Sequence, residues 1–352
     1  PWILPSVNLS SLFEQLFRSA SLDQKELACI LSSPLDKLFP LYEQANKRCI
    51  QTHGPGVYLR GIIEISNYCS RSCHYCGIRR ENQTLSRYRM SREAILDTCK
   101  LLVKHNIGTV VLQAGEDPAL NPEYIGLLIK DIKDQFPLAV TLSLGEQTRE
   151  ALAYWKQLGM DRYLIRFESS HPVLYRRCHP DSLLKDRVRC INTCQSLSVQ
   201  TGSGFLIGIP GQTINDLAGD ILFCTRLNCH MIGCGPFIRH PKTPFGQEQN
   251  VFPPHVWKAT IALLRCLNPH AYIPATTAFG IPDPQQRLSL ILSGCNVLMP
   301  DLTPAPYRRC YELYPGKGIG SSTIHREIKS ISNFLHQHKR SLLKGPGDIS
   351  LT

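Results

Sequence analysis

The chain lacks three features that would each point to a particular class of protein. No apolar run approaches the roughly 18 residues that a membrane span needs, so we do not expect a membrane protein. No segment is of low complexity, and hydrophobic residues make up 43% of the 352 residues, which predicts a sizeable folded core. Gly202, Gly204 and Gly208 do not have the G-x-G-x-x-G spacing of dinucleotide-binding loops, so that class is not indicated.

Acidic residues are fewer than basic ones, 28 against 39, which leaves a net charge of +11. Such a charge suits nucleic acid, a membrane surface or anionic substrates. The basic residues are scattered, however, and the only dense run is the pair Lys339 and Arg340. We therefore favour a solvated basic surface and do not expect nucleic acid as a partner.

Cysteine, by contrast, is abundant, with 15 residues. A secreted disulfide scaffold would be short and rich in loops, which this chain is not. Several cysteines stand in apolar or helical contexts, such as Cys99 and Cys266, where buried reduced thiols are expected. A reducing compartment follows. We expect the cytoplasm, or the interior of an anaerobic organelle if a targeting peptide precedes Pro1.

Short β-branched runs alternate with amphipathic helices along most of the chain. Three of the helices are predicted over 92–106, capped by Ser91 and stopped by Gly108, over 149–158 and over 215–227. The predicted strands are 58–65, 109–113, 138–144, 162–167, 200–207, 230–235, 271–274 and 296–299. Eight such units predict an α/β fold, a (β/α)8 TIM barrel over 54–317. A helical extension, 1–53, precedes the barrel, and a helical, then polar, tail, 318–352, follows it.

The most specific signal follows the first predicted strand. Cys69, Cys73 and Cys76 have the spacing C-x3-C-x2-C within one loop. Three thiolates in one loop can reach three corners of a [4Fe–4S] cubane and leave the fourth iron without a protein ligand, as a catalytic site requires. The alternative is a zinc site, which needs a fourth ligand. His74 is near, but it lies inside the tight loop, where bridging would be strained.

A second metal site is not expected. Cys224, Cys229 and Cys234 are regularly spaced, but they straddle a predicted helix end and a strand.

The cysteine motif resembles the signature of the radical S-adenosylmethionine (SAM) superfamily. More narrowly, the chain resembles the HydE family of [FeFe]-hydrogenase maturases, in the biotin synthase-like group. The resemblance rests on the segments 66–80, 87–90, 113–118, 141–146, 208–213, 235–238, 274–278, 299–300 and 311–317. It implies a radical SAM barrel with a [4Fe–4S] cluster and SAM, which is cleaved reductively to a 5′-deoxyadenosyl radical.

Several polar residues fall at the ends of predicted strands, the face of a barrel that carries active sites. Alternation places Arg166 and Glu168 on the same side of their strand, where they can bind polar groups of SAM or pair with each other. Residue type alone favours core packing for Met299 and a helical pair for Tyr311 and Tyr314. The resemblance implies SAM binding by Tyr75, Gln113, Arg166, Glu168, Arg187, Met299, Tyr311 and Tyr314, and a substrate cavity with Glu116, Thr141, Thr276 and Thr277.

The chain also departs from the family pattern. Phe167 stands where the family often has a histidine, and His179 stands where an arginine is usual. Arg239 and Lys242 replace less basic residues. The tail 318–352 lacks the cysteines with which some members hold a second cluster, so we predict a single cluster.

The resemblance therefore implies an enzyme of hydrogenase H-cluster assembly that acts on a small, cysteine-containing organometallic precursor. We expect Arg166 and Arg187, with Arg239 as a further candidate, to line a positive cavity. The expected partners are an electron donor such as ferredoxin or flavodoxin and other hydrogenase maturases. The alternatives are another biotin synthase-like enzyme, such as methylornithine synthase of pyrrolysine biosynthesis, and a non-catalytic metal-binding scaffold.

Overall fold

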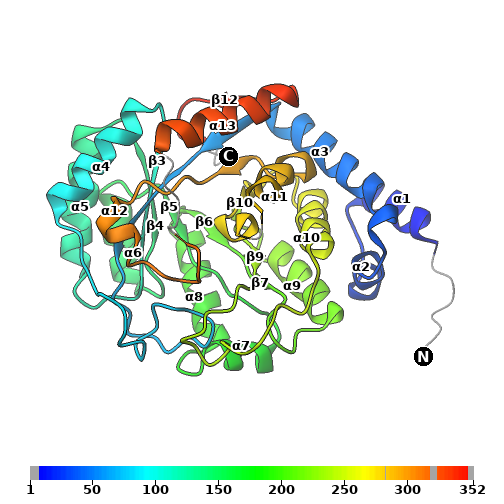
Figure 1. Cartoon of the computed structure of the whole chain (residues 1–352), viewed down its shortest axis with the longest axis horizontal. Helices are drawn as coiled ribbons and strands as arrows, with labels where there is room; N and C mark the ends of the chain where they lie inside the picture. Colours follow the sequence, from blue (N-terminus) through cyan, green and yellow to red (C-terminus); the bar gives the residue numbers. More distant parts are fainter. Residues whose placement is uncertain (1–7, 282, 318–322, 348–352) are drawn as a thin grey trace.

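The centre of the molecule is a ring of parallel strands surrounded by helices (Figure 1). The structure is a computed structural model and describes residues 8–281, 283–317 and 323–347. The strands of the ring are β1 (Gly56–Leu59), β2 (Gly61–Ser66), β3 (Thr109–Ala114), β4 (Ala139–Ser143), β5 (Arg162–Leu164), β6 (Gln200–Ser203), β7 (Leu206–Ile207), β8 (Met231–Ile232), β9 (Gly235–Pro236), β10 (Pro274–Ala275) and β11 (Val297–Leu298). All of these strand pairs are parallel.

Two sheets join to close the ring. One has the order β2-β3-β4-β5-β6-β8, and the other contains β10-β11-β1. A parallel bridge between Ile62 and Asp301 joins them at one seam, and a bridge between Met231 and Tyr272 joins them at the other. Because β1/β2, β6/β7 and β8/β9 are each one strand position with a short break, the described residues form eight positions. The predicted barrel and each predicted strand position are confirmed.

Helices follow the strand positions on the outside of the ring. They are α4 (Arg92–Lys104), α5 (Pro122–Gln135), α6 (Arg149–Gln157), α7 (Pro172–Cys178), α8 (Leu184–Ser196), α9 (Ile214–Arg226), α10 (Pro254–Leu267), η2 (Thr277–Gly280), α11 (Pro284–Ser289), η3 (Leu290–Ser293), α12 (Ala305–Arg308) and α13 (Ile324–Gln337). The predicted cap of α4 is confirmed, since the Ser91 side chain accepts from the backbone of Ala94. Among the described residues, no helix combines the length and apolar character that a membrane crossing requires.

The strands divide their side chains between two layers. Ile63 and Ile65 of β2 pack with the helices in the main core, while Glu64 points the other way, into the barrel. Trp155 of α6 is fully buried in the outer layer, and its indole N–H donates to the Pro122 carbonyl at 2.9 Å. Glu64 is therefore a buried polar side chain of the barrel interior, opposite the apolar layer between strands and helices.

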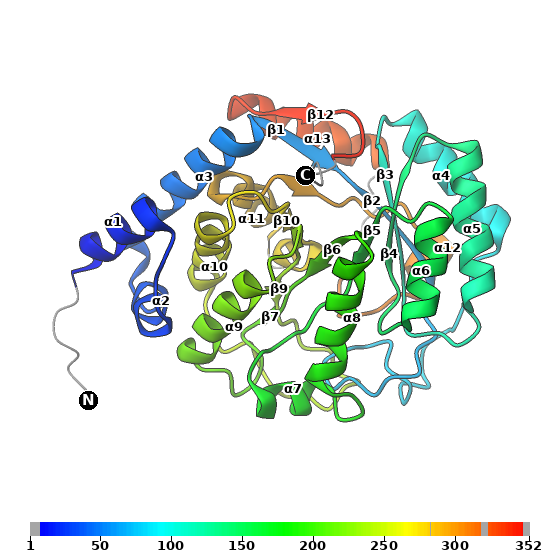
Figure 2. The ribbon, with the colours of Figure 1, turned by 180° about the vertical axis from the view of Figure 1, so that it is seen from behind.

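The N-terminal segment is helical and lies beside the barrel (Figure 2). It consists of α1 (Leu9–Ser19), α2 (Gln24–Leu31), η1 (Leu35–Lys37) and α3 (Phe39–His53). Helix α2 contacts α9, and α3 contacts α10. The Arg48 guanidinium of α3 donates to the Cys266 carbonyl at 2.6 Å and to the Phe17 carbonyl at 2.8 Å, which ties the N-terminal helices to the barrel.

The C-terminal segment adds a strand that the sequence analysis did not predict. After α13, β12 (Ser341–Leu343) pairs in parallel with β1. Beyond it, the Pro346 carbonyl accepts from Arg162 at 2.9 Å, and the Gly347 carbonyl accepts from Arg60 at 3.2 Å. The strand can form there because β3 pairs with β2 and β4 and not with β1, which leaves that edge of β1 available. Residues 341–347 of the expected tail therefore pack at the N-terminal end of the barrel.

Truncation after Arg340 tests this packing. The change removes β12 and the carbonyl groups that accept from the buried cations Arg60 and Arg162, and burying a cation without such acceptors is costly. We expect the midpoint of thermal unfolding to fall by several degrees, measured by circular dichroism. The control Ser341→Ala, at an exposed position of β12, should unfold like the unaltered chain. An unchanged midpoint after truncation would show that the segment contributes nothing to stability.

Candidate active site

The three cysteines of the motif lie in the long loop between β2 and α4, at the C-terminal end of the barrel. None of them is in a disulfide. Two side chains organise this loop, although it contains little regular structure. Asn67 is fully buried, and its amide donates to the Ser86 and Cys310 carbonyls at 2.9 and 2.7 Å. The Arg87 guanidinium donates to carbonyls from both ends of the loop, namely those of Asn67, Ile78, Arg79 and Asn82.

Burial disfavours the thiolate form of all three motif cysteines. Burial raises the pKa of Cys76 to about 12, and burial together with the charge of Cys76 raises the pKa of Cys73 well above its usual range. Burial likewise raises the pKa of Cys69, whose sulfur accepts from the backbone N–H of Arg71 at 3.4 Å. Buried thiolates that repel one another need positive charge, which an iron–sulfur core supplies. The residues therefore fit the predicted cluster.

A site for a single metal ion requires a different geometry from a site for a cubane. In the part of the chain that the structure describes, no three Cys, His, Asp or Glu side chains converge on one ion. A cubane needs no such convergence, since its thiolates bind three different iron atoms.

Two glycines allow the loop to lie close to its neighbours. A Cβ at Gly115, just after β3, would lie 2.2 Å from the Tyr68 carbonyl oxygen and 2.7 Å from the Cβ of Cys69. A Cβ at Gly77 would lie 2.0 Å from the Glu312 carbonyl oxygen. Because these neighbours are mainly backbone atoms, only glycine permits the observed approach.

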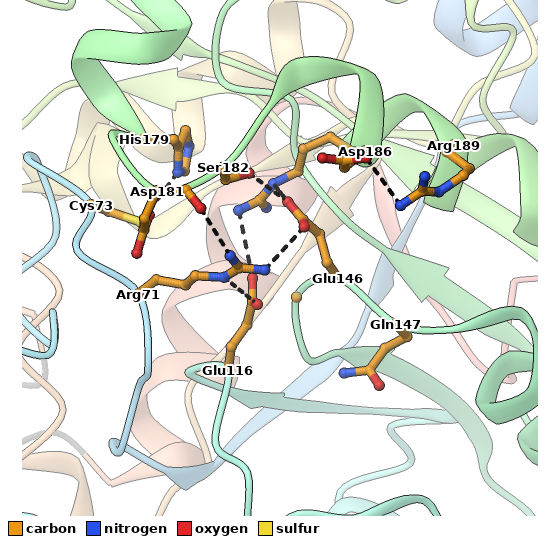
Figure 3. A network of polar contacts seen from close by, with 12 residues as sticks. Arg71, Cys73, Glu116, Glu146, Gln147, His179, Asp181, Ser182, Asp186 and Arg189 are labelled. Atoms are coloured by element: carbon orange, nitrogen blue, oxygen red, sulfur yellow. Dashed lines mark hydrogen bonds and ion pairs between the residues drawn. The ribbon is translucent and has the colours of Figure 1, made fainter.

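An ion-pair network fixes the first part of the loop to the strand ends (Figure 3). Arg71, between the first two cysteines, pairs with Glu116 at 2.5 Å and with Glu146 at 3.0 Å. Arg187 of α8 pairs with Glu146 at 2.9 Å and with Glu116 at 3.6 Å. Burial raises the pKa of Glu116 against the opposing effect of the two cations. The network joins the cysteine loop to the segments after β3 and β4.

A second polar cluster lies at the end of β5. The Tyr75 hydroxyl donates to Glu168 Oε1 at 3.1 Å, and Arg166 donates to Glu168 Oε2 at 3.0 and 2.5 Å. This contact confirms the predicted placement of Arg166 and Glu168 on one side, although β5 ends at Leu164. Phe167 between them is fully buried against Phe205. Glu168 has a φ of 64°, an unusual conformation for a side chain with a Cβ. This backbone conformation turns its carboxylate toward the cysteine loop.

Strand-end amides and hydroxyls meet the segment that follows α12. The Gln113 amide donates to the Tyr311 hydroxyl at 3.4 Å, and the hydroxyls of Thr277 and Tyr314 are 2.7 Å apart. The predicted helical pair is wrong, since Tyr311 and Tyr314 lie outside any helix and bond to different strand ends. The Thr276 hydroxyl donates to the Cys234 carbonyl at 3.0 Å.

Two candidates lie deeper in the barrel. Met299 packs against the cluster of Met231, Tyr272 and Val297, as residue type favoured. Thr141 of β4 is buried on the face opposite to Leu142, and its hydroxyl has no hydrogen-bond partner among the described residues. An unpartnered hydroxyl in the barrel interior is compatible with a ligand contact.

Comparisons with known proteins agree with this geometry. Residues 63–224 match the model of the radical SAM superfamily. The chain is 45% identical over 282 residues to the [FeFe] hydrogenase maturase subunit HydE of Thermotoga maritima, and the match covers 80% of each chain.

The chain belongs to the HydE family of radical SAM enzymes.

Other matches place this HydE-family chain near the biotin synthase-like group. It is 25% identical to 3-methylornithine synthase of Methanosarcina acetivorans, over 83% of each chain. The crystal structure of methylornithine synthase superposes with a TM-score of 0.83 at 22% identity, over 95% of this chain and 97% of the other. At this low identity, the structural similarity to methylornithine synthase shows only that the two chains share a fold.

The cationic cavity that we expected from Arg166, Arg187 and Arg239 stays a prediction. Arg166 is paired with Glu168, and Arg187 is paired with Glu116 and Glu146, so their charges are offset within the protein. Arg239 is exposed. The SAM and substrate roles that the resemblance implied for these residues remain predictions.

Two features of this HydE-family site were not predicted from the sequence. Arg71 was given no role, although an arginine between two motif cysteines and acidic residues after two strands was a usable signal. His179 was noted only as a departure from the family pattern, whereas its Nδ1 lies 3.2 Å from the sulfur of Cys73. Nothing in the spacing of 73 and 179 indicated that contact.

Gly115→Ala tests how closely the loop must approach β3. The added Cβ would meet the backbone of Tyr68 and the Cβ of Cys69, so we expect Cys69 to be displaced. Iron bound after anaerobic reconstitution should fall at least severalfold, while circular dichroism shows a folded protein.

Gly233→Ala is the matched control, because the nearest atom to its added Cβ is 3.9 Å away. It should bind iron like the unaltered protein. Full iron binding by Gly115→Ala would contradict the proposed constraint on the loop.

Proposed function

We propose that this chain acts in [FeFe]-hydrogenase maturation as a HydE-type radical SAM enzyme. The observation that carries the proposal is the 45% identity to the Thermotoga maritima maturase across most of both chains. The arrangement of three free cysteines in one organised loop at the barrel's C-terminal end supports it. The proposed substrate is a small, cysteine-containing organometallic precursor that contributes to the diiron part of the H-cluster.

The residues that would hold the cluster are Cys69, Cys73 and Cys76. When bound, a [4Fe–4S] cluster supplies the electron that cleaves SAM to methionine and a 5′-deoxyadenosyl radical. The protein's contribution is to hold the loop, to exclude water and to position SAM and substrate. Arg71 and Arg187 neutralise the carboxylates of Glu116 and Glu146 beside the loop. The thiolates are therefore not placed next to uncompensated negative charge.

The cluster of Tyr75, Arg166 and Glu168 is the proposed SAM site within the chain. Glu168 accepts from both neighbours, and its remaining lone pairs can accept from the ribose hydroxyls or amino group of SAM. Gln113, Arg187, Met299, Tyr311 and Tyr314 are proposed to complete this site, and Glu116, Thr141, Thr276 and Thr277 to contact the substrate. The Thr141 hydroxyl, which has no hydrogen-bond partner among the described residues, supports a polar precursor.

The partners follow from the chemistry. We propose a ferredoxin or flavodoxin as the electron donor and an exchange of the product with other hydrogenase maturases. Methylornithine synthase activity is the alternative, but its 25% identity is well below the 45% identity to the maturase. A scaffold without catalysis has no observation in its favour.

Cys73→Ser tests the central step. The unaltered protein, reconstituted anaerobically and reduced with dithionite, should form 5′-deoxyadenosine from SAM, measured by liquid chromatography. The serine variant should lose the cluster and lower product formation by at least a hundredfold, because a hydroxyl is a poor replacement for a thiolate ligand to iron.

Cys310→Ser is the matched control, since this partly exposed cysteine lies outside the motif. It should retain cluster and activity. The proposal fails if the unaltered protein binds zinc in place of a cluster or never cleaves SAM.

Complementation separates the hydrogenase role from other radical SAM reactions. A strain that lacks its HydE should recover hydrogenase activity with this chain and not with Cys73→Ser. Recovery of methylornithine formation in a corresponding strain, without hydrogenase recovery, would favour the alternative.

A further inference from the structure

His179 occupies an unusual position next to the cysteine loop. It directly follows α7, and its backbone N–H donates to the Tyr175 carbonyl at 2.8 Å. The residue is 1% exposed, and its ring lies against those of Tyr175 and Tyr75, with centroids 4.9 and 5.5 Å away. Contacts with two aromatic rings thus restrain it, and Figure 3 shows it directed toward Cys73.

One ring nitrogen contacts a motif cysteine. His179 Nδ1 lies 3.2 Å from the sulfur of Cys73. The other nitrogen, Nε2, is buried and has no hydrogen-bond partner among the described residues. Leaving a buried nitrogen without a partner costs free energy. Because Nε2 makes no such bond, hydrogen bonding at Nε2 does not explain the orientation of the ring. The contact with Cys73 is the polar interaction that this orientation makes.

The chemistry of a ligating sulfur determines the direction of the bond. A thiolate bound to iron has lone pairs and no proton, so it can only accept. A nitrogen at 3.2 Å must then carry the proton, which selects the tautomer with hydrogen on Nδ1. The nearby cations Arg71 and Arg187 are paired with Glu116 and Glu146, which leaves His179 as a directed donor to this sulfur.

We propose that His179 Nδ1–H donates a hydrogen bond to the Cys73 sulfur in the cluster-loaded protein and thereby raises the reduction potential of the cluster. The inference rests on the proposed function, because it requires the cluster. One-electron reduction adds negative charge to the cluster and its sulfurs, and a donor stabilises the reduced state more than the oxidised state. His179 is a positioning residue that acts through Cys73, and it makes the cluster easier to reduce.

The test is an anaerobic redox titration of the cluster followed by electron paramagnetic resonance. His179→Phe keeps an aromatic ring against the two tyrosines but removes the donor. Its midpoint potential should become more negative, and the equilibrium constant for reduction should fall about two- to tenfold, the worth of one hydrogen bond. His179→Asn retains an amide donor near the position of Nδ1 and should recover much of the potential.

His74→Phe is the matched control. His74 lies in the same loop, and its ring stacks edge-on against Phe245 at 5.8 Å, so the same substitution there should leave the potential unchanged. If His179→Phe does not load a cluster, His179→Leu takes its place in the titration.

A second measurement requires no substitution. In protein labelled with 15N-histidine, electron spin-echo spectra of the reduced cluster should contain a weak nitrogen coupling through the hydrogen bond. A fully loaded donor-less variant with the unaltered potential, or the lack of that coupling, overturns the inference. In that case SAM cleavage under dithionite still supports the proposed function. If the unaltered protein binds no cluster at all, the proposed function itself is contradicted.

Discussion

The site depends on holding an irregular, cysteine-bearing loop rigidly against the end of a barrel. The ion pairs of Arg71 and Arg187 with Glu116 and Glu146 provide this constraint. Two positive and two negative groups balance one another, so no net charge is buried. Removing one member would leave an uncompensated charge, which typically costs about 3–5 kcal/mol at a fully buried site and less at this partly exposed one. The network therefore makes the loop position depend on β3, β4 and α8 at once.

Other contacts also hold the cysteine loop in place. Asn67 and Arg87 satisfy its backbone carbonyls, which would otherwise be buried without donors. Gly77 and Gly115 allow backbone-to-backbone approach where a larger residue would push the loop away. The buried ion pair between Lys317 and Glu64 ties the segment after α12 to β2. The mouth is thus enclosed by contacts from elements that are distant in sequence.

Much of the fold was accessible from local pattern. Alternating strand and helix signals predicted the eight strand positions, and Ser91 marked the start of α4 correctly. The strand β12 was missed, because a three-residue strand has too little pattern to stand out from a polar tail. The helical pair at Tyr311 and Tyr314 was wrong because an i, i+3 spacing does not by itself produce a helix. Local sequence patterns predict local structure. The strand β12 and the positions of Tyr311 and Tyr314 depend instead on contacts with residues that are distant in sequence.

The sequence by itself determined the cysteine spacing, the strand order and hence the end of the barrel at which the polar residues gather, since these follow from chain order and from the right-handed βαβ connection. Only the tertiary structure decided which polar groups pair. It placed Arg187 against two glutamates, turned Glu168 toward Tyr75, and brought His179 to the sulfur of Cys73. The physical reason is that pairing depends on distances of a few ångströms between side chains from different loops, which no one-dimensional spacing encodes.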